Sequence, residues 1–375
     1  MVPVARCSGL GVGVGARQFA RQLAGLRASA GWTLGRGLAT LPPQEPAVVS
    51  LLAGTSQSNY AYNMHGGEIM KLADTAGSVA ALRWLNQVVD PATDSERPNF
   101  NAAVATIGRT EFLQPAHLGE LISASATVAY TSKHTVVVNV KVTAENMLKR
   151  IQRTTNTVQL IYVALDGNIE DELKVTKETI PQLAHSSSPA AATARQLYLS
   201  STLHLSGTNA AWLQQQWNSP TWTETLSKLV LPDQTHLNKI IRGGEVAKQI
   251  DEVAAMAALR FAAADSNIRE SIKTMVTATM ESITFKKPCH VGDLLSVKAR
   301  PTFAQGKSVE IEVIALSETL ETSTKNVIAH GFLVFVVLDH NNKTLLLPTL
   351  ASDSGAKMRY LERKQRRESV RTSKE

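Results

Sequence analysis

The segment GGEIMKLAD at residues 66–74 decides the fold, because it returns later in the chain as GGEVAKQID at residues 243–251. A second motif behaves in the same way: Pro-x-His-x-Gly occurs at residues 115–119 and again at residues 288–292. The order of the two motifs is the same in both places. A repeat on this scale predicts two copies of one domain in tandem.

Each copy continues with the same pattern of secondary structure. The Gly-Gly pair opens a long helical pattern rich in small residues, at 67–84 in the first copy and 244–262 in the second. A run of strands is predicted at 103–112, 121–130, 135–144 and 154–165, and at 274–285, 294–303, 308–316 and 325–338; the valines at 136, 138, 140 and 142 show the alternation typical of a half-buried strand. One long helix followed by antiparallel strands predicts an α+β fold in which the helix packs on the sheet.

Charge is concentrated at the two ends of the chain. The net charge of +7 arises from 39 Lys+Arg against 32 Asp+Glu, yet no acidic residue precedes Glu45, and the last nineteen residues are strongly basic. The body is therefore mildly acidic, which argues against a nucleic-acid-binding domain. We divide the chain into a leader (1–44), domain 1 (45–183), a Ser/Ala/Pro-rich linker (184–200), domain 2 (201–356) and a basic tail (357–375).

The leader and the tail each carry a prediction. Arg17, Arg21 and Arg27 lie in an acid-free segment, which is typical of a mitochondrial transit peptide and predicts the mitochondrial matrix; the alternative is a disordered basic arm. The tail is expected to be an amphipathic helix that docks on the domain through Met358, Tyr360 and Leu361. No apolar stretch in the sequence has the length of a membrane span.

The start of each long helix is a candidate binding site. Free N–H groups and the helix dipole at Gly66, Gly67, Gly243 and Gly244 suit a polarised carbonyl or a developing oxyanion. Glycine also allows a ligand to approach the backbone closely. The alternative is that the Gly-Gly pairs serve only tight packing of the helix.

Two carboxylates lie two turns inside these helices, Asp74 and Asp251, each on a stripe of small, apolar residues. A carboxylate in such surroundings is costly to bury and has a raised pKa, as a general base acting on water requires. A structural Asp bonded to a loop explains the spacing equally well, so both interpretations stay open from the spacing alone.

The two copies differ just before the glycines. Asn63 precedes the first pair, whereas Ile240 stands at the matching position and has no side-chain donor. If a site needs one amide donor and one carboxylate from different copies, only Asn63 with Asp251 is complete. The reciprocal pair, Ile240 with Asp74, lacks the amide.

Other chemistries find little support in the sequence. There is no G-x-S-x-G elbow, no phosphate-binding loop and no metal-ligand spacing of histidines, so we predict no metal and no cofactor. We interpret Cys289 as a structural thiol and His117 and His290 as turn-forming residues. Two matching hairpin turns offer cations and hydroxyls that either hold phosphates or are simply solvated: Ser132, Lys133 and His134, and Lys307 and Ser308.

The motifs together resemble the hotdog-fold acyl-coenzyme A thioesterases, in particular the tandem-domain acyl-CoA hydrolases of the brain/cytosolic long-chain type. The residues that carry this resemblance are 63–67, 130–135, 145–146, 242–244, 251–253 and 359–361. The resemblance implies two hotdog domains, each a sheet wrapped around its central helix, which form a pseudo-dimer with the active site between them. It also implies that three chains assemble as a trimer of pseudo-dimers.

For the site, the resemblance implies that Asp251 activates water while Asn63 and a glycine N–H polarise the thioester carbonyl, giving fatty acid and coenzyme A. Asp74, where that branch usually has Glu, and His65 raise the possibility of a second site. Three alternatives remain beside the hydrolase. They are a non-catalytic acyl-CoA binder on the same fold, a dehydratase or hydratase with His65 as its base, and nucleic-acid binding through the tail.

Overall fold

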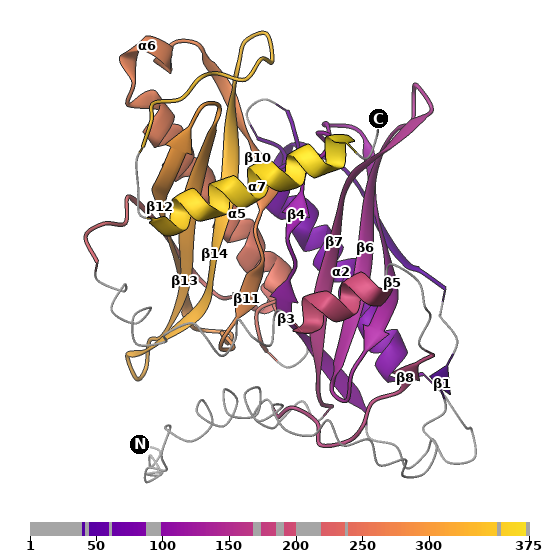
Figure 1. Cartoon of the computed structure of the whole chain (residues 1–375). Helices are drawn as coiled ribbons and strands as arrows, with labels where there is room; N and C mark the ends of the chain where they lie inside the picture. Colours follow the sequence, from indigo (N-terminus) through magenta and orange to yellow (C-terminus); the bar gives the residue numbers. More distant parts are fainter. Residues whose placement is uncertain are drawn as a thin grey trace.

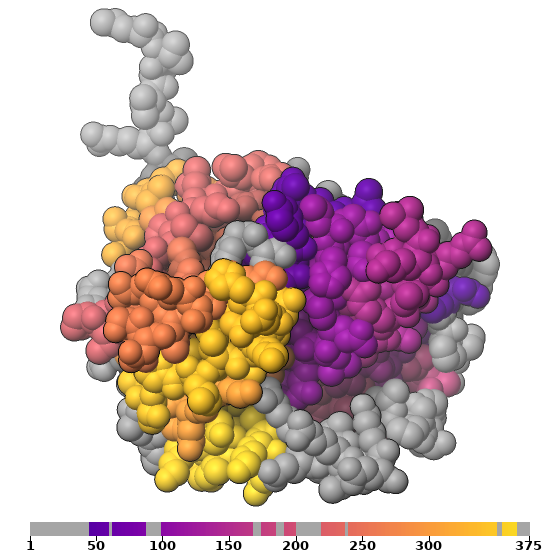
Figure 2. All heavy atoms as spheres, turned by 90° about the horizontal axis from the view of Figure 1, so that it is seen from above, coloured from indigo at the N-terminus to yellow at the C-terminus, as the bar shows by residue number. Residues whose placement is uncertain are grey.

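The computed structural model describes residues 40–41, 45–59, 62–87, 99–167, 174–184, 191–199, 219–236, 239–350 and 354–372. The predicted transit peptide lies outside these residues except for a two-residue strand, β1 (Thr40–Leu41). Two lobes of similar build stand side by side, with the first copy in indigo to magenta and the second in orange to yellow (Figure 2).

The two copies share one order of elements, a strand, a 3-10 turn, a long helix and five further strands, to which the first adds β8 and the second adds α6 and α7 (Figure 1). The first copy has β2 (Ala47–Leu52), a 3-10 turn (Thr55–Gln57), α2 (Gly66–Leu85), β3 (Phe100–Ile107), β4 (Thr110–Glu111), β5 (Leu121–Thr131), β6 (Thr135–Asn146), β7 (Ile151–Asp166) and β8 (Gln182–Leu183). The second has β9 (Glu224–Leu229), a 3-10 turn (Pro232–Gln234), α5 (Gly243–Ala263), α6 (Ser266–Arg269), β10 (Ile272–Met280), β11 (Ile283–Phe285), β12 (Leu294–Gln305), β13 (Ser308–Thr319), β14 (Thr324–Asp339) and α7 (Ser354–Thr372).

One 12-stranded sheet runs through both copies. Ten of its strands lie in the order β2-β5-β6-β7-β3 in the first copy, continuing as β11-β14-β13-β12-β9 in the second, and β10 and β4 lie off this path, with β10 pairing to β14 and β4. The halves are joined where Ile283 of β11 pairs with Ile107 of β3. This confirms the predicted α+β fold of two tandem hotdog domains, since each half-sheet covers one long helix.

The long strands predicted at 103–112 and 274–285 are each broken into two. β3 pairs with β7 of its own copy along most of its length and meets β11 of the other copy only at its end, whereas β4 pairs with β10 of the other copy, where Thr110 meets Met280. The break follows Gly108, whose added Cβ would lie 2.8 Å from the Gln159 carbonyl oxygen. The chain bends there because it must leave one half-sheet to reach the other.

The N-terminal ends of α2 and α5 cross closely at the centre of the molecule. A Cβ on Gly67 would lie 2.6 Å from the Cα of Lys248, and one on Gly244 would lie 2.8 Å from the Cα of Lys71. Two ion pairs bridge the crossing, Lys248 to Glu68 at 2.6 Å and its counterpart between Lys71 and Glu245 at 2.8 Å. The Gly-Gly pairs therefore do serve close packing, here between the two helices of the pseudo-dimer.

Each half-sheet also carries a helix on its outer face. Residues 191–199, within the predicted linker, form a helix whose Ala194 packs on Val137 and Ile161. α7 covers the second half-sheet and begins at Ser354, ahead of the predicted tail. In the part of the chain that the structure describes, no helix is long and apolar enough to cross a membrane.

The docking of α7 differs from the prediction. Met358 and Leu361 are exposed, and the predicted role of these two residues is therefore wrong. Arg359 and Arg363 instead bind the buried carboxylate of Glu310 at 2.7 and 2.6 Å, and Tyr360 contacts the ring of Phe303 as expected. A charged residue on the sheet face attracts arginines, which the apolar pattern of the tail did not reveal.

Candidate active site

Asp251 lies two turns inside α5 and is 1% exposed. Its Oδ2 accepts a hydrogen bond from the Gly67 N–H of the other copy at 2.9 Å, and its Oδ1 accepts one from the Thr277 hydroxyl at 2.6 Å. Burial raises the pKa of Asp251, while these two donors and the nearby His65 oppose that rise. The carboxylate is thus held by both copies and has a higher proton affinity than an exposed Asp.

His65, which we had assigned to a possible second site, lies beside Asp251 instead. Its Nδ1 is 4.0 Å from Asp251 Oδ2. His65 is the residue immediately before α2, at the helix end that lies beside the carboxylate of the other copy. This proximity joins His65 to the Asp251 site.

Asn63 lies in the same loop before α2, two residues ahead of His65. The Nδ1 of His117 contacts its Oδ1 at 2.8 Å. If that nitrogen carries the proton, the amide oxygen is satisfied within the protein, and the amide NH₂ is the group left to donate to a ligand. His117, expected only to form a turn, is therefore also a partner of the predicted amide.

Asn59 is a second amide in the same loop, and it was not among the residues predicted from the sequence. Its Oδ1 accepts the backbone N–H of Asn63 at 3.1 Å, and its own N–H donates to the Asn63 carbonyl at 2.8 Å. This tight turn brings both amides to the same cavity. The matching residue in the second copy is His236, so position 59 is polar in both copies, whereas Asn63 is matched by the apolar Ile240. The amide at position 59 was therefore a signal available in the sequence.

A cavity of about 910 Å³ joins these groups. Its polar residues include Asn59, Asn63, His65, Asp251 and Thr277. Its apolar wall is built from both copies, by Ile69, Phe112, Leu226, Ala255, Met256, Leu259 and Phe335. A large, mainly apolar cavity with a few convergent polar groups is the usual form of a small-molecule site.

The reciprocal carboxylate, Asp74, has matching bonds but a different neighbour. Its Oδ2 accepts the Gly244 N–H at 2.8 Å, and its Oδ1 accepts the Tyr162 hydroxyl at 2.8 Å. Burial raises the pKa of Tyr162 well above its usual range, so this phenol stays a donor. The structure places Val104 against Gly243, the position that Thr277 holds against Gly66.

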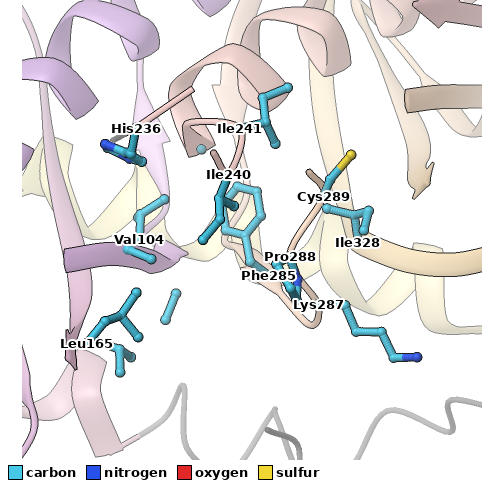
Figure 3. Close-up of a pocket in the computed structure, with 14 residues that line it drawn as sticks. Val104, Leu165, His236, Ile240, Ile241, Phe285, Lys287, Pro288, Cys289 and Ile328 are labelled. Atoms are coloured by element: carbon cyan, nitrogen blue, oxygen red, sulfur yellow. The ribbon is translucent and has the colours of Figure 1, made fainter. Parts of the chain in front are cut away.

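Only a small space remains at this second position, about 50 Å³ (Figure 3). Its lining is mostly apolar, with Val104 and Leu165 of the first copy facing Ile240 and Phe285 of the second. Asp74 is not part of that lining. Cys289, at its edge, is buried, and burial raises the pKa of its thiol, as expected of a structural cysteine.

The five residues proposed for phosphates stay away from the large cavity. None of Ser132, Lys133, His134, Lys307 and Ser308 is among its lining residues. In the first turn, the Ser132 hydroxyl contacts that of Thr135 at 2.5 Å, and the His134 ring contacts the Glu178 carbonyl at 3.2 Å. Two of the three residues in this turn therefore already have partners within the protein.

Comparisons with known proteins identify the family of both copies. The family model of the thioesterase superfamily matches residues 62–151 and 238–324, one match in each copy. The human cytosolic acyl coenzyme A thioester hydrolase is 30% identical over 351 residues, covering 88% of this chain and 86% of that protein. The rat protein of the same name is 31% identical and covers 83% and 81%.

Among solved structures, an acyl-CoA hydrolase of Staphylococcus aureus in complex with butyryl coenzyme A and coenzyme A is 26% identical, with a TM-score of 0.35. The match covers 40% of this chain and 90% of the Staphylococcus aureus chain. The names of the relatives contradict one prediction. They are called cytosolic, so the mitochondrial-matrix location is wrong and the transit peptide has no support.

Proposed function

Because this chain belongs to the acyl-coenzyme A thioester hydrolases of the thioesterase superfamily, we propose that it hydrolyses fatty acyl-CoA thioesters to a free fatty acid and coenzyme A. The observation that carries this proposal is the buried Asp251, held by both copies at the wall of the large apolar cavity. Coenzyme A enters as part of the substrate and leaves as a product, and the proposed reaction needs no further cofactor.

In the proposed mechanism Asp251 is the general base. It takes a proton from water, and the resulting hydroxide forms a bond to the thioester carbonyl carbon. The tetrahedral intermediate then collapses as the carbon–sulfur bond breaks, and Asp251 returns the proton to the leaving thiolate. Its raised pKa suits both steps, because an ordinary Asp is too weak a base near neutral pH.

The carbonyl oxygen needs donors in the same cavity. The Gly67 N–H already donates to Asp251, so we assign it to positioning the base and not to the oxyanion. Gly66 lines the cavity, and among the described contacts nothing accepts its N–H. We therefore propose that Gly66 and an asparagine amide polarise the carbonyl.

Two asparagines compete for that role. Asn63 is our first candidate, because His117 contacts its oxygen and so directs its NH₂ toward other partners. Asn59 is the second, because its oxygen is likewise engaged, by the Asn63 N–H. Comparing Asn63→Ala with Asn59→Ala in kcat decides between them, since loss of an oxyanion donor lowers kcat about 10²–10³-fold.

The test of the site as a whole uses its own duplicate as a control. Asp251→Asn should abolish most thiol release from acyl-CoAs of graded chain length. Asp74→Asn, equally buried and bonded to the matching glycine, should leave most of it. Equal losses in the two variants would mean that the carboxylates are structural. Acyl-CoA binding without thiol release by the unaltered protein would support the non-catalytic binder instead.

We also propose that three chains assemble as a trimer of pseudo-dimers. A hexameric acyl-CoA thioesterase is among the similar structures, with 29% identity over 40% of this chain and a TM-score of 0.32. Our proposal does not rest on that likeness but on the family resemblance of the sequence. Light scattering of the purified protein measures the mass directly, and a monomer would contradict it.

A further inference from the structure

The hairpin between β6 and β7 ends in an exposed apolar tip. Leu148 is 98% exposed, Ile151 55% and Met147 49%, which makes this tip unusual among the described surface residues. Lys149 and Arg150 lie between them and are exposed as well. The hairpin projects beyond the neighbouring strands at the upper right of Figure 1.

The fold does not require this sequence at the tip. The matching hairpin between β13 and β14 has the same turn, since Arg150 in one and Ser323 in the other both have φ 54. Its turn reads Leu-Glu-Thr-Ser at 320–323, against Met-Leu-Lys-Arg at 147–150. The first tip is thus basic and apolar, whereas the second is acidic and mostly polar.

The first tip stands close to the mouth of the large cavity. Arg153, two residues into β7, donates to the carbonyl of Pro115 at 2.6 Å, and the N–H of Leu113 donates to the Thr155 carbonyl at 2.8 Å. Leu113 and Pro115 both line the cavity. At about 3.3 Å per strand residue, the tip projects roughly 10 Å beyond that rim.

The size of the tip favours one kind of partner. Three side chains on a two-stranded hairpin bury at most a few hundred Å², well below the roughly 800 Å² per partner of a stable protein interface. Apolar side chains flanked by cations instead match a bilayer with anionic headgroups, where the cations meet lipid phosphates or carboxylates and the apolar groups enter the acyl region.

We propose that the β6–β7 tip binds the surface of an anionic membrane. Leu148 and Ile151 enter the lipid, and Lys149 and Arg150 contact the headgroups. The second tip, which carries Glu321, does not take part. A site for fatty acyl thioesters is thereby placed beside the phase into which such amphiphiles partition.

The test is co-sedimentation of the full chain with phosphatidylcholine vesicles, with and without phosphatidylserine. We expect stronger binding to the phosphatidylserine vesicles, and a roughly tenfold loss with Leu148→Ser, from the burial of one leucine side chain. Lys149→Glu should remove the preference for phosphatidylserine. Leu320→Ser, an exposed leucine at the acidic tip, is the matched control and should bind like the unaltered protein.

Three results would overturn the proposal. The first is that the unaltered protein binds neither kind of vesicle, and the second is that Leu148→Ser binds them as well as the unaltered protein does. The third is that Leu148→Ser lowers the mass of the assembly in light scattering, which makes the tip a contact between copies of this chain. Thiol release from a short-chain acyl-CoA in the absence of vesicles should be unchanged in all variants. The sedimentation readout needs no catalysis, so its outcome is separate from that of the proposed activity.

Discussion

Replacing Thr277 by valine isolates the hydrogen bond that tunes the proposed base. The side chains have nearly the same shape, so the main change is loss of the 2.6 Å bond to Asp251. Asp251 is 1% exposed, and a buried hydrogen bond to a charged group contributes about 1.5–3 kcal/mol. At about 1.36 kcal/mol per pKa unit, its loss raises the pKa of Asp251 by roughly one to two units.

The assay is the pH dependence of kcat/KM for acyl-CoA hydrolysis. Because the ionised carboxylate is the active form, activity falls as the pH drops through the pKa of Asp251, which is already raised by burial. Thr277→Val should move this acid limb to higher pH by that amount, with little change on its plateau. Thr279→Val is the control: its hydroxyl is buried on the same strand and has no partner among the described residues. An acid limb that stays in place in Thr277→Val refutes the reasoning.

Three further predictions concern stability and positioning. Asp251→Asn should unfold at the same or a higher temperature than the unaltered protein at neutral pH, because the raised pKa of Asp251 in the folded state makes its ionised form unfavourable there. The difference in melting temperature should shrink in acid, where the carboxylate is protonated. A lower melting temperature of the variant at neutral pH would contradict this. Gly67→Ala should lose about 1–3 kcal/mol or more in urea unfolding, since its Cβ would lie 2.6 Å from the backbone of α5; an unchanged midpoint would show that the helices can separate freely. His117→Ala should lower kcat more than it changes KM if His117 orients Asn63. His290→Ala is the control, because His290 lies in the matching turn of the second copy and pairs with Ile240, and it should change neither; equal effects of the two substitutions would remove the positioning role.

The repeat in the sequence was enough to predict the main architecture, because each copy had to bury a long helix of small residues against its own sheet. The edge strands β2 and β9 were missed. They are short and half exposed, with Ser50 or Ser227 among their apolar residues, so no clear alternation marks them. The crossing of β4 to the other half-sheet was also invisible, since pairing between copies leaves no local pattern.

The site was predictable where the two copies differ, and less so where contacts are long-range. The contrast between Asn63 and Ile240 pointed to the side of the molecule where the structure has its large cavity. The bonds from Thr277 and from the Gly67 N–H to Asp251 span 26 and 184 residues, and no spacing in the sequence reports them. The role of Arg359 and Arg363 was hidden for the same reason, because Glu310 lies on a distant strand.

The bonds from Gly67 to Asp251 and from Gly244 to Asp74 mean that each half completes the carboxylate site of the other. In a symmetric homodimer, every substitution would appear in both sites at once. Joining the halves in one polypeptide lifts that restriction: Val104 and Ile240 close one position while Thr277 and Asn63 keep the other open. Inheritance as a single gene thus lets one site specialise as a packing interface, and neither half, made separately, would contain a whole site.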